Sequence, residues 1–380
     1  MNVPFYSLDY VNRALGDALR ESFSDVLDSK WFIRGNRCCE FEEAFAAYCG
    51  KKACVGVGNG LDALTLMLKA SILLGRMATG DEVIVPANTF VATVLAVRAA
   101  GVVPVLVEPD PETCVLDASK LAEACSAKTR AILAVHLYGR LADMPAICEF
   151  AKVHHLLVFE DAAQAHGAVS SEFGVRNSEL TIQSTAAYSF YPTKNLGAMG
   201  DGGAVVTDDL ELAQVVKSLG NYGSVEKYVN KYVGVNSRLD EVQAAVLLEK
   251  LPYLDSWNKR RQEIAARYCA EINNPLVRVT PVPANPKSHV WHVFPVFCEA
   301  RDDLQKFLKD RGVETLIHYP IPPHLQEAFD GALSRGELRY GPLPIAEKLA
   351  KTELSIPMGP SMTDEQVSYV IEVINSYKVR

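Results

Sequence analysis

The segment Leu156-Leu157-Val158-Phe159-Glu160-Asp161-Ala162-Ala163-Gln164-Ala165-His166-Gly167 ends an apolar run with a carboxylate, an amide and an imidazole. Apolar residues at consecutive positions are typical of a strand that is covered on both faces of a mostly parallel sheet. Because open α/β sheets bind ligands at the carboxyl ends of their strands, Asp161, Gln164 and His166 are candidate site residues. A helix cap is the alternative interpretation of Asp161 taken by itself.

Similar apolar runs lie on both sides of this segment and alternate with helical patterns. The runs predicted to be strands are Ala53–Val57, Glu82–Val85, Val103–Val107, Ala131–Val135, Leu156–Glu160, Ala186–Phe190 and Ala204–Thr207. Helical spacing of apolar residues is found between them, for example over Asp62–Leu74, Ala92–Ala100 and Met144–His154. This alternation predicts a doubly wound α/β fold with a mostly parallel sheet.

The pattern changes after about Asn236. A long helical pattern begins at Arg238, and Pro252 is expected to kink or break it. Pro-rich strand-and-turn segments and two amphipathic helices follow, over Thr280–Pro286, His318–His324, Arg339–Pro344, Asp302–Arg311 and Asp364–Tyr377. At ~150 residues per domain the chain is long enough for about two domains. We expect a large domain over residues 1–245 and a smaller C-terminal α+β domain over 246–380.

The composition excludes several classes of protein. With 49% apolar and 22% charged residues, the 380-residue chain has the composition of a globular protein and not of a disordered one. A net charge of −8 without a long basic run argues against nucleic acid as a partner. Neither a signal peptide nor a membrane span is apparent. The nine cysteines show no metal-ligand spacing, which predicts reduced thiols, a cytoplasmic location and no metal site.

The glycine-rich segment Gly56–Ala63 follows a predicted strand and opens a predicted helix. Glycines let the backbone approach an anion, and a helix N-terminus offers N–H donors, so a phosphate could bind here. An NAD-binding fold would place an acidic residue at the end of the next strand, whereas Asp81 and Glu82 lie at its start. An NAD-dependent sugar-nucleotide oxidoreductase is therefore disfavoured, and a glycine turn without a ligand stays open.

Lys194 follows another predicted strand and stands between Pro192 and a glycine-dense loop. A lone lysine is usually a surface charge, but one beside an apolar strand end can act as an amine nucleophile toward an aldehyde. The glycine-rich turn, Asp161 and Lys194 together supply what a pyridoxal phosphate site needs. These parts are donors for the phosphate, a carboxylate for the ring nitrogen and an amine for the aldehyde.

Motifs spread over nearly the whole chain carry a resemblance to one family. They are Trp31–Gly35, Gly58–Leu64, Gly80–Ile84, Pro86–Ala92, Val135–Gly139, Glu160–Ala168, Ser189–Gly203, Asn236–Asp240 and Gln243–Ala245. In these motifs the sequence resembles the DegT/StrS sugar-nucleotide aminotransferases, which are fold-type-I pyridoxal phosphate enzymes. The resemblance implies an α/β large domain, a small C-terminal domain and a homodimer with shared active sites.

The resemblance also implies roles for particular residues. Lys194 would be the catalytic residue that forms the Schiff base with the cofactor, and Asp161 would pair with its pyridinium nitrogen. Gln164 would face the ring hydroxyl, and Phe90 would pack on the ring. The phosphate would be held by the backbone of Gly60 and Leu61, by Ser189, and by Asn236 of the partner subunit. Leu61 stands where relatives commonly carry Thr or Ser, which removes a hydroxyl and leaves the amide.

The activity that the resemblance implies is transfer of the amino group of L-glutamate to C3 of a nucleotide-linked 3-keto-6-deoxyhexose, most similar to the dTDP-linked substrates. The loop Lys194–Gly203 resembles C3 enzymes, whereas C4 enzymes more often end this loop in Glu-Gly-Gly. The product, a dTDP-3-amino-3,6-dideoxyhexose, would serve deoxysugar biosynthesis for surface glycans such as O-antigen or for natural products. A C4 aminotransferase and a non-catalytic regulatory relative are the alternatives. The intact Lys194, Asp161 and Gln164 count against the second.

Candidate contacts to the sugar nucleotide are less well defined. They are Tyr191, next to the lysine loop, and His318, Tyr319 and His324 in a Pro-rich segment. Such segments also carry histidines with a purely structural role, so both interpretations stay open. The adjacent Cys38 and Cys39 have no explanation from the sequence.

Overall fold

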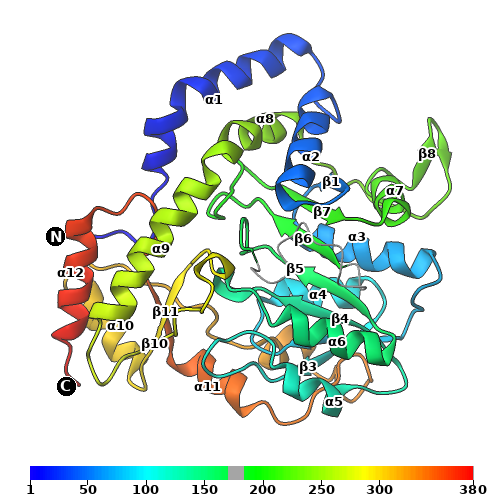
Figure 1. Ribbon diagram of the computed structural model, residues 1–380. Coiled ribbons are helices and arrows are strands. Elements are labelled where there is room, and N and C mark those ends of the chain that lie inside the picture. The colour runs from blue at the N-terminus through cyan, green and yellow to red at the C-terminus, as the bar shows by residue number, and fades with distance from the viewer. Residues whose placement is uncertain (170–183, 380) are drawn as a thin grey trace.

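The computed structural model describes residues 1–169 and 184–379, and a seven-stranded sheet lies at its centre (Figure 1). The strands are β1 (Ala53–Val57), β2 (Glu82–Pro86), β3 (Val103–Val107), β4 (Thr129–Val135), β5 (Leu157–Asp161), β6 (Thr185–Ser189) and β7 (Gly203–Thr207). Their order is β1-β7-β6-β5-β4-β2-β3, in which only β7 runs antiparallel to its neighbours. The prediction of a mostly parallel sheet is confirmed.

Each predicted strand overlaps an observed one, and the differences at the ends have local causes. β6 ends at Ser189 instead of Phe190, because the Phe190 amide donates to the Gly202 carbonyl at 2.7 Å and opens the following loop. β5 extends to Asp161, which is therefore the last residue of its strand.

Both faces of the sheet are buried, because successive side chains of a strand point to opposite sides. Val83 and Val85 of β2 pack in one hydrophobic core, whereas Ile84 between them packs in another. The first core includes α3 (Gly60–Leu73), α4 (Val91–Ala99) and α7 (Leu210–Leu219). The second includes α5 (Leu121–Ala124) and α6 (Met144–His154). This double covering explains why the strands read as continuous apolar runs.

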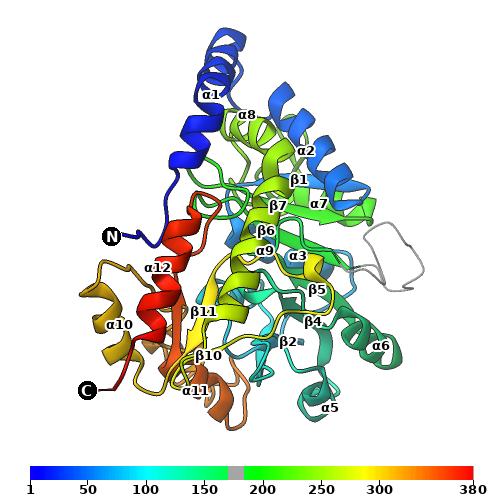
Figure 2. The same ribbon diagram turned by 60° about the vertical axis from the view of Figure 1, so that its left-hand side comes forward.

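Further helices surround the β1–β7 end of the sheet. They are α1 (Asp9–Ser29), α2 (Asn36–Cys49) and α8 (Glu241–Lys250), and α1 and α8 lie side by side in both ribbon views (Figure 2). A short hairpin, β8 (Ser224–Glu226) and β9 (Val229–Asn230), projects from the body. The predicted break at Pro252 is confirmed, because a 3₁₀ turn over Leu251–Tyr253 separates α8 from α9 (Leu254–Glu271).

A third hydrophobic core, the C-terminal core, is built largely from the C-terminal part of the chain. Three antiparallel strands, β10 (Arg278–Val279), β11 (Phe294–Phe297) and β12 (Glu353–Ile356), pack with α9, α10 (Arg301–Lys309) and α12 (Asp364–Asn375). The strands lie outside the three Pro-rich segments in which strands were expected. Proline offers no N–H to a ladder, which explains why those segments are mostly irregular instead.

The first core and the C-terminal core each include residues from a distant part of the chain. Val3 packs in the C-terminal core and pairs with Val313, although it lies near the N-terminus. Conversely, Phe329 and Leu338 pack on the first core, shortly before α11 (Pro344–Thr352). The division at residues 245 and 246 stays a prediction. Within residues 1–169 and 184–379, none of the helices combines the length and the apolar character that crossing a bilayer requires.

Candidate active site

The predicted site residues converge at the carboxyl ends of β5 and β6. Asp161 ends β5 and Ser189 ends β6, and the loop between β6 and β7 carries Lys194. The start of α3 packs directly on this edge, since a Cβ on Gly60 would lie 2.7 Å from the Cβ of Ser189. The structure therefore brings together the glycine-rich turn, the acid and the lysine that lie far apart in the sequence.

The turn before α3 is shaped to bind an anion. Asn59 caps the helix, because its side chain accepts a hydrogen bond from the Asp62 amide at 2.8 Å. Within the described residues, the amides of Gly60 and Leu61 donate to no protein group. A helix N-terminus with two open amides beside the Ser189 hydroxyl fits a phosphate.

Asp161 is buried and its two oxygens have defined partners. Thr93 of α4 donates to Oδ2 at 2.7 Å, and the Ala163 amide donates to Oδ1 at 3.2 Å. Turns and not a helix follow Asp161, so it is not a helix cap. Burial raises the pKa of this carboxyl, although Thr93, the Ala163 amide and Lys194 oppose the rise. A buried carboxylate fits the protonated ring nitrogen of pyridoxal phosphate as its cationic partner.

Lys194 lies in a tight loop. Its amide donates to the Tyr191 carbonyl at 2.8 Å, and a Cβ on Gly197 would lie 2.4 Å from the Pro192 oxygen. The loop is also held from behind, where Lys250 Nζ donates to the Gly197 carbonyl at 2.5 Å. Burial lowers the pKa of Lys194 to about 8, and the negative charge of Asp161 opposes this shift. The amine is thus suited to react with an aldehyde near neutral pH.

Gln164 belongs to a closed ring of contacts. Its Oε1 accepts from the Tyr138 amide at 2.5 Å, and its Nε2 donates to Tyr319 Oη at 3.0 Å. The Tyr138 hydroxyl donates to the His318 carbonyl at 2.5 Å, which closes the ring through the next residue. Phe90 joins this group, since its ring centroid is 4.9 Å from that of Tyr319. His318 and Tyr319 are therefore brought to the site.

The remaining predicted residues lie differently. Tyr191 is exposed beside the lysine loop, and Asn236 is exposed next to Ser237, whose hydroxyl accepts from the Gly58 amide at 2.9 Å. His324 is buried, and its Nε2 lies 3.3 Å from Glu347 of α11. His166 is fully buried between the rings of Tyr188 and Phe190, and burial lowers its pKa to about 3.

Sequence reasoning missed several residues of the site. Thr93 and Tyr138 hold Asp161 and Gln164, yet neither of them is assigned a role from the sequence. Tyr138 lies in the motif Val135–Gly139, just after β4, which was the available signal for it. The signal for Thr93 is weaker, because Thr93 stands among apolar residues on the buried face of α4.

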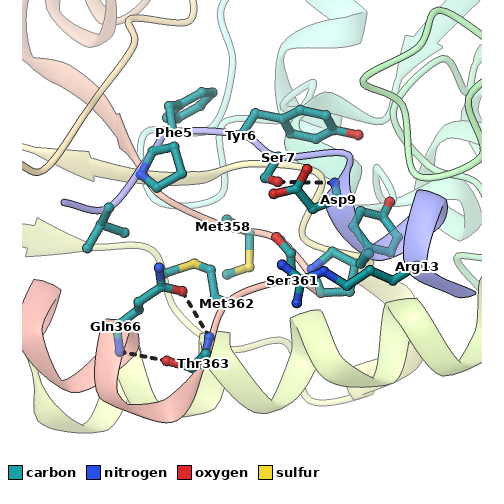
Figure 3. A pocket seen from close by; sticks show the side chains of 15 residues that line it. Phe5, Tyr6, Ser7, Asp9, Arg13, Met358, Ser361, Met362, Thr363 and Gln366 are labelled. Carbon is teal, nitrogen blue, oxygen red and sulfur yellow. Dashed lines mark hydrogen bonds between the residues drawn. The ribbon is translucent and has the colours of Figure 1, made fainter.

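A cavity of about 370 Å³ lies away from Lys194, between the N-terminal segment and the turn before α12. Figure 3 shows Phe5 and Tyr6 across from Met358 and Met362. Tyr6 connects this region to the lysine loop, because its hydroxyl lies 3.5 Å from the Pro192 carbonyl. The cavity does not include the residues predicted to bind the cofactor.

Comparison with known proteins identifies close relatives. The family model described as the DegT/DnrJ/EryC1/StrS aminotransferase family matches residues 14–375. The chain is 46% identical to the dTDP-3-amino-3,6-dideoxy-alpha-D-galactopyranose transaminase of Aneurinibacillus thermoaerophilus, and the match covers 99% of each chain. It is 44% identical to S. venezuelae DesV, solved in complex with a ketimine intermediate, with a TM-score of 0.91 over 98% of each chain.

A third relative bears on the cofactor. NtdA from Bacillus subtilis, solved with bound cofactor PMP, is 33% identical, with a TM-score of 0.86 over 98% of this chain and 84% of that one. The predicted fold class, an aminotransferase and pyridoxal phosphate as its cofactor are confirmed by these matches. The chain belongs to the DegT/DnrJ/EryC1/StrS aminotransferase family.

Proposed function

We propose that this protein transfers the amino group of L-glutamate to C3 of a dTDP-linked 3-keto-6-deoxyhexose. The main observation behind this proposal is that three features lie together at one edge of the sheet. They are the amine of Lys194 with its lowered pKa, the buried carboxylate of Asp161 and the anion-binding turn before α3. The similarity to the dTDP-3-amino-3,6-dideoxy-alpha-D-galactopyranose transaminase of Aneurinibacillus supports the C3 position and the dTDP group. The product would enter deoxysugar biosynthesis for surface glycans such as O-antigen or for natural products.

Each cofactor contact has a structural basis. Lys194 would bind the aldehyde, Asp161 would pair with the ring nitrogen, and the amides of Gly60 and Leu61 with Ser189 would hold the phosphate. Phe90 would cover the ring and Gln164 would face its hydroxyl. Once bound, pyridoxal phosphate supplies an electron sink that makes a proton on the adjoining substrate carbon labile. Asp161 keeps the sink effective because its charge retains the proton on the ring nitrogen.

Lys194 Nζ is the group that moves the proton. With a pKa of about 8, a useful fraction of this amine is neutral near pH 7 and can act as a general base. As an ammonium, Lys194 would be able to give the proton back. The tight loop and the contact from Lys250 to the Gly197 carbonyl fix the backbone that carries this amine.

The orientation of Gln164 follows from its partners. Its Oε1 accepts the Tyr138 amide, so its Nε2 is the end that donates toward Tyr319 and the cofactor hydroxyl. Tyr319 and His318 therefore border the space in which the sugar would be aminated. We include Tyr191 and His324 as further candidate contacts to the sugar nucleotide.

A homodimer with shared sites is part of the proposal. Large apolar side chains are exposed close to Asn236 in sequence, among them Tyr228 at 90% and Val233 at 98%. Trp31 on another segment is 64% exposed. Exposed apolar side chains such as these support a contact between subunits, where they would be buried. Asn236 would reach the cofactor phosphate of the partner subunit. The nine free cysteines fit a cytoplasmic location.

The test supplies purified holoenzyme with glutamate and either a dTDP-3-keto- or a dTDP-4-keto-6-deoxyhexose. NMR of the product should show nitrogen at C3 from the first substrate and little turnover of the second. Nitrogen at C4 would refute the assignment and favour the C4 alternative. Conversion of neither sugar by an enzyme that accepts glutamate would also refute it.

A further inference from the structure

Glu353, the first residue of β12, is a buried acid that the proposed reaction does not use. It is 1% exposed, and its Oε2 accepts a hydrogen bond from the His318 amide at 2.6 Å. Its Oε1 lies 2.5 Å from Ser355 Oγ, and Ser355 Oγ in turn lies 2.8 Å from His318 Nδ1. The three side chains form an unbroken line from a carboxyl group to an imidazole at the edge of the site.

The backbone fixes this line. Glu353 and Ser355 are two apart on β12, so their side chains point to the same face. The segment before His318 pairs with β12 through two hydrogen bonds between Leu316 and Ser355, at 3.1 Å and 2.7 Å. His318 thereby falls opposite Glu353, and its carbonyl is held by the Tyr138 hydroxyl.

The electrostatic surroundings favour a protonated Glu353. Burial raises its pKa to about 8, although Ser355, the His318 amide and Arg301 oppose the rise. Arg301 Nη1 donates to the backbone oxygen of Glu353 at 3.1 Å and not to its carboxyl. The other titratable groups that face this carboxyl are Tyr138, Tyr319, Cys114 and His318.

The number of protons along the line from Glu353 through Ser355 to His318 determines the tautomer of the His318 ring. A serine hydroxyl has one proton, so Ser355 can donate to only one neighbour. If Glu353 Oε1 carries a proton and donates it to Ser355, the Ser355 hydroxyl donates to His318 Nδ1. The single proton of the neutral ring is then on Nε2. Burial, with the nearby charge of Lys194, lowers the pKa of His318 to about 4, so the ring is neutral.

We propose that Glu353, acting through Ser355, is a positioning residue that keeps the proton of His318 on Nε2, so that this nitrogen donates a hydrogen bond to the sugar nucleotide. Within the described residues, Nε2 makes no hydrogen bond to protein. An Nε2–H donor matches a keto, hydroxyl or diphosphate oxygen. The inference rests on the proposed function, since that function brings the sugar to His318.

Loss of the Glu353 proton reverses the line. Glu353 gives its proton to Ser355, and Ser355 gives its own proton to His318 Nδ1. The Ser355 hydroxyl then donates to the carboxylate, and the proton on Nε2 leaves to solvent. The ring stays neutral and one proton is released in total. His318 then presents an acceptor to the sugar oxygen, and binding weakens as the pH rises through about 8.

The first test compares the two half-reactions over pH, using glutamate for one and a dTDP-3-keto-6-deoxyhexose for the other. In the wild type, kcat/KM for the sugar should fall above about pH 8 more than kcat/KM for glutamate. In E353Q the amide is a permanent donor to Ser355, so the sugar reaction should stay within about twofold of wild type at pH 7 and lose this additional alkaline fall. An unchanged alkaline fall in E353Q would overturn the proposal.

Ser355→Ala breaks the line and leaves the contact between Glu353 and the His318 amide. Because removing one hydrogen-bond partner leaves the other buried group unsatisfied, kcat/KM for the sugar should fall about tenfold or more. The glutamate reaction should change by less than about twofold. Equal losses in both half-reactions would indicate a merely structural role. E82Q is the control for E353Q, since Glu82 is also a buried carboxylate but lies in the seven-stranded sheet, at the start of β2, where it accepts hydrogen bonds from Ser126, Thr129 and Arg339.

A measurement on the holoenzyme without substrate separates this inference from the proposed function. NMR of protein labelled in the histidine rings reports the tautomer, and the His318 signal is assigned by its loss in H318N. At pH 7 the signal should be that of the Nε2–H form, and it should move toward the Nδ1–H form above about pH 8. An Nδ1–H form at pH 7 would overturn the proposal, even if the enzyme aminates the sugar. The Nε2–H form in an enzyme that rejects both sugars would instead refute the proposed function.

Discussion

The two sides of the candidate site are built in different ways. On one side, Asp161, Ser189 and Lys194 stand at or just after the ends of neighbouring strands, whose pairing sets their spacing. On the other side, His318 and Tyr319 stand in an irregular segment that is placed by single contacts to Tyr138, Gln164 and Glu353. The first side belongs to chemistry that every aminotransferase of this type performs, and the second faces the part of the substrate that varies. Substitutions should therefore affect the two sides differently.

The largest effect is expected on the strand side, at Lys194. Lys194→Ala removes the amine that binds the cofactor and moves the proton, so kcat should fall by roughly 10²- to 10⁴-fold or more. Borohydride should attach the cofactor to the Lys194 peptide in the wild type and to no peptide in the variant, as mass spectrometry can detect. Turnover within tenfold of wild type would contradict the role assigned to this lysine.

Asp161→Asn tests the charge on the same side. Breaking a buried ionic pair costs about 3–5 kcal/mol, so kcat should fall roughly 10²- to 10⁴-fold in both half-reactions. Thr93→Val is the matched variant, because it removes one hydrogen bond to the same carboxylate and keeps the charge. It should cost only about 0.5–1.5 kcal/mol. Equal losses in the two variants would show that the charge of Asp161 is unimportant.

Tyr319→Phe tests the loop side and should have a smaller and more selective effect. The substitution removes the hydrogen bond from Gln164 Nε2 and keeps the ring beside Phe90. A loss of about 0.5–1.5 kcal/mol corresponds to a two- to twelvefold fall in kcat/KM for the sugar. The glutamate half-reaction should change less. A larger loss with glutamate than with the sugar would show that Tyr319 does not act mainly in sugar recognition.

The smallest effect is a shift along the pH axis. The neutral form of Lys194 reacts with the aldehyde, so uptake of pyridoxal phosphate by cofactor-free enzyme should accelerate as the pH rises and level off above about 8. Asp161 raises the pKa of Lys194, so the midpoint should move to lower pH in Asp161→Asn. Stopped-flow absorbance can follow the uptake. A midpoint that stays in place would show that the two groups do not interact.

The same contrast explains what the sequence could predict. Consecutive apolar residues mark a doubly covered strand, and the residues after such a strand lie at the ligand-binding edge, so Asp161 and Lys194 could be located. The role of Ser189 came only from the resemblance to the family. The sheet and the break at Pro252 follow from similarly local signals. The partners of Asp161 and Gln164 could not be located, because Thr93 and Tyr138 reach them through packing between distant segments. The line from Glu353 to His318 depends on the pairing of Leu316 with Ser355, which no local pattern reveals.

The antiparallel pairing of β6 and β7 has a practical consequence for engineering new specificities. Ser189 and Gly203 are directly opposite each other, so the loop between them is anchored at both ends. An insertion or deletion there would displace the Lys194 amine, and libraries should keep the length of residues 190–202 constant. Diversity is better introduced around residues 318–324, where an altered side chain can reshape sugar recognition without moving the ends of β5 and β6.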